Sequence, residues 1–505
     1  MKNQHTKGLL LSYCSTALNL LTGFALTPVL LSALGQEDYS LYKVIQSLAG
    51  SLMMFNLGLS TITARAVARQ DSRQETDTAF SLAVTASFAA AGMVILLGFG
   101  LSRCLPWLFD YSPEQLDTAG ELTLIFSAAT AAHIVSDTFR GCAQGKERFS
   151  FLHGTACIQH LLRFGGMLLA ARNTGLGIVR LALVDFGLYL LLLVLNGCYC
   201  RFSLGQRMGK VTLNREALTP FLSFGIAILL QAVTTQISSN LDLVILGAVN
   251  APPRIITAYS SALTVSTVYS SLIMAVSGLY FPEAARLTAG HADGEMLTDF
   301  VIRPGRLQAA VALGILSGFA LLGRDFIRIW IGPEYEAGYP LTLLLMAAAT
   351  LSLVQYACVA ILDARLKRLF RSCVGLVMAA GNLMLSLLLV KPLGFWGPAL
   401  GTAISLIGQD ILMNRYYSRF LGLNIRRMLR EILCGILPAA GLSCLICLPL
   451  TLVPERLFFL KCIGFSLVYA FFLWKVGLTS EEKRILAKGV LHGSKRTHPP
   501  TADHR

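Results

Sequence analysis

Long apolar stretches without a charged residue constrain the fold of this chain more than any other feature. Residues 9–34 and 81–101 are two of many such stretches, and each is long enough to cross a hydrocarbon core of about 30 Å as an α-helix. In the whole chain 54% of the residues are hydrophobic and 14% are charged, whereas soluble domains carry roughly 25% charged residues. The sequence therefore predicts an all-α polytopic membrane protein and excludes a series of soluble domains.

The apolar stretches predict about fourteen transmembrane helices joined by short loops. The predicted spans are 9–34, 41–64, 79–101, 119–139, 150–171, 176–198, 218–248, 257–281, 305–323, 341–362, 372–390, 397–417, 432–453 and 457–476. The 12 cysteines lie mostly within these spans, where they are typical small apolar residues and indicate no disulfide framework.

The distribution of basic residues predicts the orientation of the chain. If the N-terminus is cytoplasmic, most of the 42 lysine and arginine residues fall in cytoplasmic segments, as the positive-inside rule requires. We therefore expect both termini to be cytoplasmic, which needs an even number of spans. The net charge of +14 reflects this topology. Because the basic residues are spread over separate segments, they do not indicate a nucleic-acid partner.

Weak internal similarity indicates two parallel repeats. Residues 122–124 recur at 341–343, and residues 58–59 recur at 278–279, both with an offset of about 220 residues. Six predicted spans in each copy make the repeats parallel, and two such bundles rocking about a central cleft form a transporter architecture. The predicted organisation is an N-terminal six-helix lobe (8–205), a cytoplasmic linker (206–213), a C-terminal six-helix lobe (214–424), two extra C-terminal transmembrane helices (432–476) and a cytoplasmic basic tail (477–505).

Polar side chains inside the predicted spans mark candidate binding sites, because such groups are costly to bury in lipid. In the first, seventh and eighth spans they recur on one helix face, which is typical of helices that line a water-filled cleft, although Ser and Thr also bond to their own helix. The substrate-binding candidates are Arg163, Lys43, His160, Asn19, Gln231, Ser238 and Thr264. The ion-coupling candidates are Asp242 and Asp185, for which a structural ion pair is the alternative.

Catalytic and metal-binding motifs do not support an enzyme. The segment 141–146 has the spacing GxxxGK, and Glu147 stands where a phosphate-binding loop needs Ser or Thr. The sequence contains neither HExxH nor GxSxG. We therefore expect no enzymatic activity, no metal and no other cofactor.

Several segments resemble one family of membrane proteins. They are the first-loop stretch 28–42, Leu57-Gly58-Leu59 running on to Arg65, Asn240-Leu241-Asp242, Ala258-Tyr259, Phe281-Pro282-Glu283, Asn382 and the turn 394–403. Together they resemble the polysaccharide-biosynthesis flippases of the multidrug/oligosaccharidyl-lipid/polysaccharide (MOP) superfamily, over roughly residues 8–420.

This resemblance implies a flippase that moves an undecaprenyl-pyrophosphate-linked oligosaccharide across the bacterial inner membrane. The implied partners are the lipid-linked oligosaccharide and membrane lipids, and the carboxylates Asp242 and Asp185 add H⁺ or Na⁺ as a candidate coupling ion. Two alternatives remain: a lipid II flippase, or a cation-coupled multidrug exporter of the same superfamily. Lipid II flippases of this superfamily carry basic residues in the first span, and this chain has none there.

Overall fold

The computed structural model describes residues 2–69, 73–172, 177–206, 215–277, 287, 293–364 and 368–484. Within these ranges all regular structure is helical and no strand is present, which confirms the prediction of an all-α protein. Each of the fourteen predicted spans is mainly helical where it is described, with short breaks such as the turns at 57–58 and 434–435. Residues 278–286, which include Phe281-Pro282-Glu283 of the family resemblance, lie outside the described residues.

The number of membrane crossings follows less directly from the helices. Among the described residues, eight stretches are long and apolar enough to cross a membrane, or nine if a bent pair, Gly338–Val354 and Tyr356–Leu362, is one span. One of the eight, Leu10–Ala68, runs through the first two predicted spans. The eight do not include the helices at 149–172, 215–248, 253–277 and 396–421. The count of fourteen therefore stays a prediction.

The chain divides into two compact units. The first unit comprises Met1–Val268, Ile327–Ala349 and Arg365–Met413, and the second comprises Tyr269–Phe326, Thr350–Ala364 and Asn414–Arg505. Each unit is made of three separate segments of the sequence, whereas each predicted six-helix lobe is one continuous segment. The two predicted lobes remain predictions.

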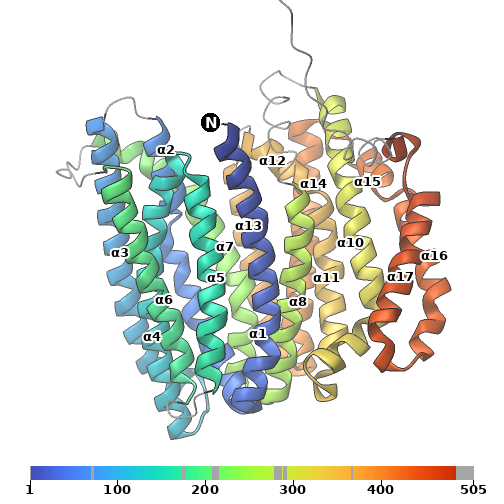
Figure 1. Cartoon of the computed structure of the whole chain (residues 1–505), viewed down its shortest axis with the longest axis horizontal. Helices are drawn as coiled ribbons and strands as arrows, with labels where there is room; N and C mark the ends of the chain where they lie inside the picture. Colours follow the sequence, from blue (N-terminus) through green and yellow to red (C-terminus); the bar gives the residue numbers. More distant parts are fainter. Residues whose placement is uncertain are drawn as a thin grey trace, which may run out of the picture. The chain divides into compact units, whose positions relative to one another are not determined.

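Helices of the first unit form a bundle. In Figure 1, α3, α4, α5 and α6 run side by side, and α1 packs against α4, α5 and α7. The helices that lie wholly or mainly in this unit are α1 (Lys2–Gly50), α2 (Leu59–Arg69), α3 (Arg73–Leu108), α4 (Pro113–Gly145), α5 (Phe149–Arg172), α6 (Val179–Cys198), α7 (Arg215–Ala248), α8 (Pro253–Ser277), α11 (Gly338–Val354), α13 (Arg368–Leu393) and α14 (Trp396–Leu421), with the short helices η1 (Ser51–Asn56), η2 (Tyr199–Ser203) and η3 (Pro333–Tyr335).

Helix α1 is interrupted twice, and these interruptions shape the site described below. Gly35 has φ 74° and ψ 177°, so α1 consists of two helical limbs joined at a kink. Such a backbone conformation suits glycine because it has no Cβ. Pro28 lies inside the first limb, where it removes one backbone donor. After Gly50 the chain continues as the 3₁₀ helix η1, and Leu57 and Gly58 take left-handed conformations before α2 begins.

Glycines on α4 allow α2 to approach closely. A Cβ placed on Gly141 would lie 2.3 Å from the Ser60 carbonyl oxygen, and one on Gly145 would lie 2.5 Å from that of Ala64. Small residues at such crossings increase van der Waals contact between membrane helices. At its other end α4 begins with a capping box in which Ser112 and Gln115 bond to each other's backbone N–H, a typical helix start.

The second unit contains most of α10 (Gly294–Trp330) together with α12 (Tyr356–Ala364), α15 (Ile425–Leu433), α16 (Ile436–Cys447) and α17 (Phe458–Phe472). It also contains the short helices η4 (Leu448–Leu452), η5 (Glu455–Leu457) and η6 (Leu473–Gly477). Two ion pairs connect α10 to the C-terminal segment of this unit. Lys461 Nζ lies 2.7 Å from Asp325 Oδ2, and Arg306 Nε lies 2.7 Å from Glu482 Oε1.

Arg306 also bonds to backbone groups at the ends of the neighbouring helices. Its guanidinium donates to the carbonyl oxygens of Glu431, Cys434 and Gly477 in addition to the Glu482 carboxylate. The carbonyls of a helix C-terminus lack donors within their own helix. One buried side chain therefore satisfies the C-terminal ends of α15 and η6 together.

Candidate binding pocket

A polar pocket lies inside the first unit, with a cavity volume of about 530 Å³. Helices α1, α4, α6, α7 and α8 and the short helix η1 contribute its walls. The polar residues that line it are Asn19, Lys43, Gln46, Ser47, Thr130, His133, Tyr189, Gln236, Asn240, Ser260, Thr264 and Thr267. This volume lies within the range of about 300–1,000 Å³ that is typical of small-molecule sites.

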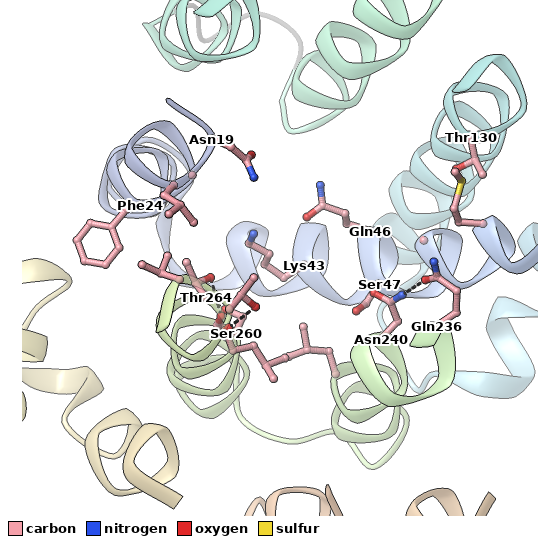
Figure 2. A pocket seen from close by; sticks show the side chains of 18 of the residues that line it. Asn19, Phe24, Lys43, Gln46, Ser47, Thr130, Gln236, Asn240, Ser260 and Thr264 are labelled. Carbon is pink, nitrogen blue, oxygen red and sulfur yellow. Dashed lines mark hydrogen bonds between the residues drawn. The ribbon is translucent and has the colours of Figure 1, made fainter. Parts of the chain in front are cut away.

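The two limbs of α1 face the same space because of the kink at Gly35. Asn19 comes from the first limb, and Lys43 and Gln46 come from the second. Figure 2 shows these three side chains pointing into one cavity. The Lys43 ammonium lies 5.6 Å from the centre of the Tyr39 ring, and Tyr39 is fully buried. A cation over an aromatic face is stabilised electrostatically.

Amide groups of α7 form a second wall. The Asn240 side chain donates to the Gln236 side-chain oxygen over 2.6 Å, which fixes both amides on one face of the helix. Gly50 lies opposite, and a Cβ there would be 3.5 Å from the Asn240 oxygen. Amides offer both donors and acceptors, so this wall suits a ligand with hydroxyl or acetamido groups.

Hydroxyl groups of α8 complete the pocket. Ser260 and Thr264 donate to carbonyl oxygens three and four residues earlier, and Thr267 donates to the carbonyl oxygen of Leu263. This satisfies each hydroxyl proton within the helix, and the oxygen lone pairs remain able to accept bonds from a ligand. On the side of α4 and α6, the rings of His133 and Tyr189 stack with centroids 4.6 Å apart.

Charge in the pocket has one sign. Among the described residues that line it, Lys43 is the charged one, and none is an aspartate or a glutamate. Lys43 therefore makes the pocket suited to an anionic group.

The sequence-predicted candidates divide into two groups. Asn19, Lys43 and Thr264 line the pocket. Arg163, His160, Gln231, Ser238, Asp242 and Asp185 are not among the residues that line it. Gln231 donates to the Thr235 hydroxyl over 3.4 Å, which is a contact within its own helix.

Arg163 and Asp185 pair with each other. Arg163 Nε lies 2.7 Å from Asp185 Oδ1, and its Nη2 lies 3.2 Å from Oδ2. The Asp185 side chain is 5% exposed and that of Arg163 is 35% exposed. Such a two-point contact joins α5 to α6 and is among the strongest ion-pair geometries.

Asp242 belongs to a separate buried network. Its Oδ2 accepts hydrogen bonds from the Tyr259 hydroxyl over 2.7 Å and from the Thr402 hydroxyl over 2.9 Å. Asn382 donates to Thr402 and accepts from Ser386. The ion pairs found among the described residues do not include Asp242. It is therefore a buried carboxyl held by hydroxyl groups rather than by Arg254 or Lys43.

Sequence reasoning missed several residues of the pocket, among them Gln46, Ser47, Gln236, Asn240 and Tyr189. One available signal was the spacing of Gln236 and Asn240, four residues apart on α7. The predicted stripe on this helix, which contains Gln231, Ser238 and Asp242, lies on nearly the opposite face of an ideal helix. The sequence contains both stripes, and only packing decides which one faces a cavity.

A bundle of apolar helices around a polar pocket that contains a lysine is typical of membrane transporters. The chain belongs to the polysaccharide biosynthesis protein family, whose model matches residues 6–287. It is thus a multi-pass membrane protein. A comparison with curated proteins gives no match.

Solved structures with the same fold are transporters and flippases. The chain is similar to the lipid II flippase MurJ in an inward closed conformation, with a TM-score of 0.67 and 15% identity over 95% of this chain and 99% of that one. An inward-facing multidrug resistance MATE family transporter of the MOP superfamily gives a TM-score of 0.62 and 13% identity, over 79% and 92% of the two chains. A eukaryotic MATE transporter gives 0.57 and 12%, over 85% and 98%. The chain therefore has the fold of the MOP superfamily.

Proposed function

We propose that this protein is a flippase that moves an undecaprenyl-pyrophosphate-linked oligosaccharide across the bacterial inner membrane for surface polysaccharide biosynthesis. Membership of the polysaccharide biosynthesis protein family supports the pathway class. The single observation that carries the substrate class is the pocket around Lys43, which combines a cation, amides and hydroxyls and is lined by no acidic residue.

The chemistry of such a substrate matches this lining. Its pyrophosphate and sugars cannot enter hydrocarbon unaided, whereas its polyprenyl tail can stay in lipid. Lys43 can form a charge-assisted hydrogen bond with a phosphate oxygen. The amides of Gln46, Gln236 and Asn240 can bond to sugar hydroxyls, and the Tyr189 ring offers an apolar face to a sugar. Arg163 and His160 on α5 remain candidates for a second contact during the cycle.

The proposed mechanism is alternating access between two six-helix lobes, 8–205 and 214–424. Both termini would then lie in the cytoplasm, and the linker 206–213 and the tail 477–505 would follow the cytoplasmic face. The basic residues Arg201, Arg207, Lys210 and Arg215 in and beside the linker suit contact with anionic lipid headgroups. No nucleic acid, catalytic residue or cofactor has a part in this proposal.

The test replaces Lys43 by Met in cells that depend on this gene for their surface polysaccharide. We expect surface polysaccharide to fall about ten-fold or more, because a charge-assisted hydrogen bond to the substrate is lost. The lipid-linked oligosaccharide should accumulate in the same cells. Lys43→Arg keeps the charge and should retain most of the export. Lys391→Met removes a charge outside the pocket and should have no effect.

Two other cargoes make different predictions. A lipid II flippase would complement loss of cell-wall precursor transport and would leave surface polysaccharide unchanged on deletion. A multidrug exporter would lower drug accumulation in cells, and it would need an acidic partner for a cationic drug. Normal surface polysaccharide with Lys43→Met, at normal protein level, would refute the role of the pocket.

A further inference from the structure

Pro28 leaves a backbone carbonyl of α1 without its ordinary helical donor. In an α-helix the N–H of residue 28 would bond to the carbonyl oxygen of residue 24, and proline has no N–H. A carbonyl without a donor is costly in a bilayer, which supplies no water. Phe24, the residue that carries this carbonyl, also lines the pocket beside Asn19.

Trp330 supplies a replacement donor. Its indole Nε1 lies 3.2 Å from the Phe24 carbonyl oxygen. The two rings also stack, with centroids 4.3 Å apart and an angle of 8° between their planes. Both residues belong to the same compact unit, although they are 306 positions apart in the sequence. Trp330 thus contacts Phe24 in two ways, by a hydrogen bond to its carbonyl oxygen and by a stack on its ring.

We propose that Trp330 is a positioning residue of the transport pocket, which holds the proline-interrupted limb of α1 so that Asn19 faces the cavity. The stack fixes the Phe24 ring against Trp330, and with it the turn of α1 that follows Asn19. The indole N–H stabilises the interrupted backbone at the same point. This inference rests on the proposed transport function for its consequence, but the contact itself is tested separately.

A double-mutant cycle separates the two parts of the contact. Trp330→Phe keeps an aromatic ring and removes the donor, and Pro28→Ala returns an N–H to the helix at the position that faces the Phe24 carbonyl. Thermal stability of the purified full chain in lipid nanodiscs is the first measurement. We expect Trp330→Phe to destabilise the chain when Pro28 is present, and to have little effect when residue 28 is alanine. Trp107→Phe, at an indole that is 87% exposed, controls for the substitution itself.

Export of surface polysaccharide by the same variants is the second measurement. Loss of one hydrogen bond changes an equilibrium by about three- to ten-fold, so Trp330→Phe should lower export by about that factor at equal protein level. Pro28→Ala in the same chain should restore it. A substrate titration should place the loss in KM, because the pocket wall is displaced while Lys43 is intact.

The outcomes distinguish this inference from the proposed function. Equal effects of Trp330→Phe with Pro28 and with alanine at position 28 would overturn the positioning role. Coupling in stability, in a chain that exports no polysaccharide even as wild type, would preserve the contact and refute the proposed function. Coupling in stability, with export by Trp330→Phe equal to that of the wild type, would show a structural contact only and would also overturn the inference.

Discussion

Because Arg163 forms an ion pair with Asp185, replacing Arg163 alone cannot show whether this arginine binds substrate. The sequence predicts Arg163 as a substrate ligand because this residue lies well inside its predicted span. In the structure it makes a two-point contact with a carboxylate whose side chain is 5% exposed. Replacing the arginine alone would leave that carboxylate buried without its ion-pair partner, so loss of function would not identify a binding role.

We expect Arg163→Ala to destabilise the protein by about 1–3 kcal/mol, less than for a fully buried pair, because the Arg163 side chain is 35% exposed. The double variant Arg163→Ala with Asp185→Ala should regain most of that stability. Export by the stable double variant then decides the role of the arginine. Export near the wild-type level would remove Arg163 from the substrate site, and low export at normal stability would support it.

Some residues of the pocket can be predicted from the sequence because polar groups are costly to bury in lipid. Asn19, Lys43 and Thr264 are polar residues in apolar helices, and the cost of burying them in lipid marks them directly. Gln46 and Ser47 have the same signal, and they follow Lys43 by three and four residues, on the same helix face. Tyr189 has almost no signal, because aromatic residues are common on every face of a membrane helix. Its place in the wall depends on the rotation of α6, which packing against α4 sets.

At the scale of the element, the least predictable feature was the break between α1 and α2. The predicted second span ran from 41 to 64 without interruption, whereas the chain forms a 3₁₀ helix at Ser51–Asn56 and a left-handed turn at Leu57 and Gly58. The sequence SLMMFN is apolar and compatible with an α-helix. Asn56, whose side chain donates to Asp137 over 3.1 Å, anchors the break from α4, and a contact between distant segments leaves no local pattern.

The contact between Arg306 and Glu482 makes the C-terminal segment sensitive to acid. Burial by itself raises the pKa of Glu482, but the hydrogen bonds and charge of Arg306, together with Thr479, outweigh burial and hold this pKa below its ordinary value. A lowered pKa in the folded state adds stability above the ordinary glutamate pKa of about 4.3, and this stability is lost as the pH falls through the folded pKa.

We expect the thermal stability of the wild type to fall between about pH 5 and pH 3 more steeply than that of Glu482→Gln. At pH 7 the variant should be less stable by about 1–3 kcal/mol, because it loses a charge-assisted contact to Arg306. Thermal melts across this pH range in nanodiscs make the measurement. Parallel curves for the two proteins would contradict the assignment, and Glu481→Gln at the neighbouring exposed residue provides the control.

At the scale of the whole molecule, the fold is shared with transporters that are only 12–15% identical. A sequence identity this low supports only a shared arrangement of helices. The cargo and the coupling ion have to be inferred from the side chains of this chain. The network around Asp242 is the clearest local candidate for an ion. It brings a carboxylate, three hydroxyls and an amide together from α7, α8, α13 and α14, and hard cations such as Na⁺ prefer oxygen ligands of this kind.

We expect Asp242→Asn to weaken or abolish the dependence of export on an H⁺ or Na⁺ gradient, since the amide can neither release a proton nor supply a charge. Export should be measured in vesicles with each gradient imposed in turn. Asp110→Asn, in the segment between α3 and α4, is the matched control. Unchanged gradient dependence in a stable Asp242→Asn protein would eliminate the coupling role.

The ion pairs of α10 with the C-terminal segment have a consequence for biogenesis. Asp325 and Arg306 precede their partners Lys461 and Glu482 by 136 and 176 residues. At a synthesis rate of about 5–20 residues per second, roughly 7–35 s pass before those partners are made. Throughout this interval α10 carries uncompensated charges, so its final seating in lipid has to wait for the last helix pair. A ribosome stalled before α17 should therefore hold α10 in a state that an insertase still contacts.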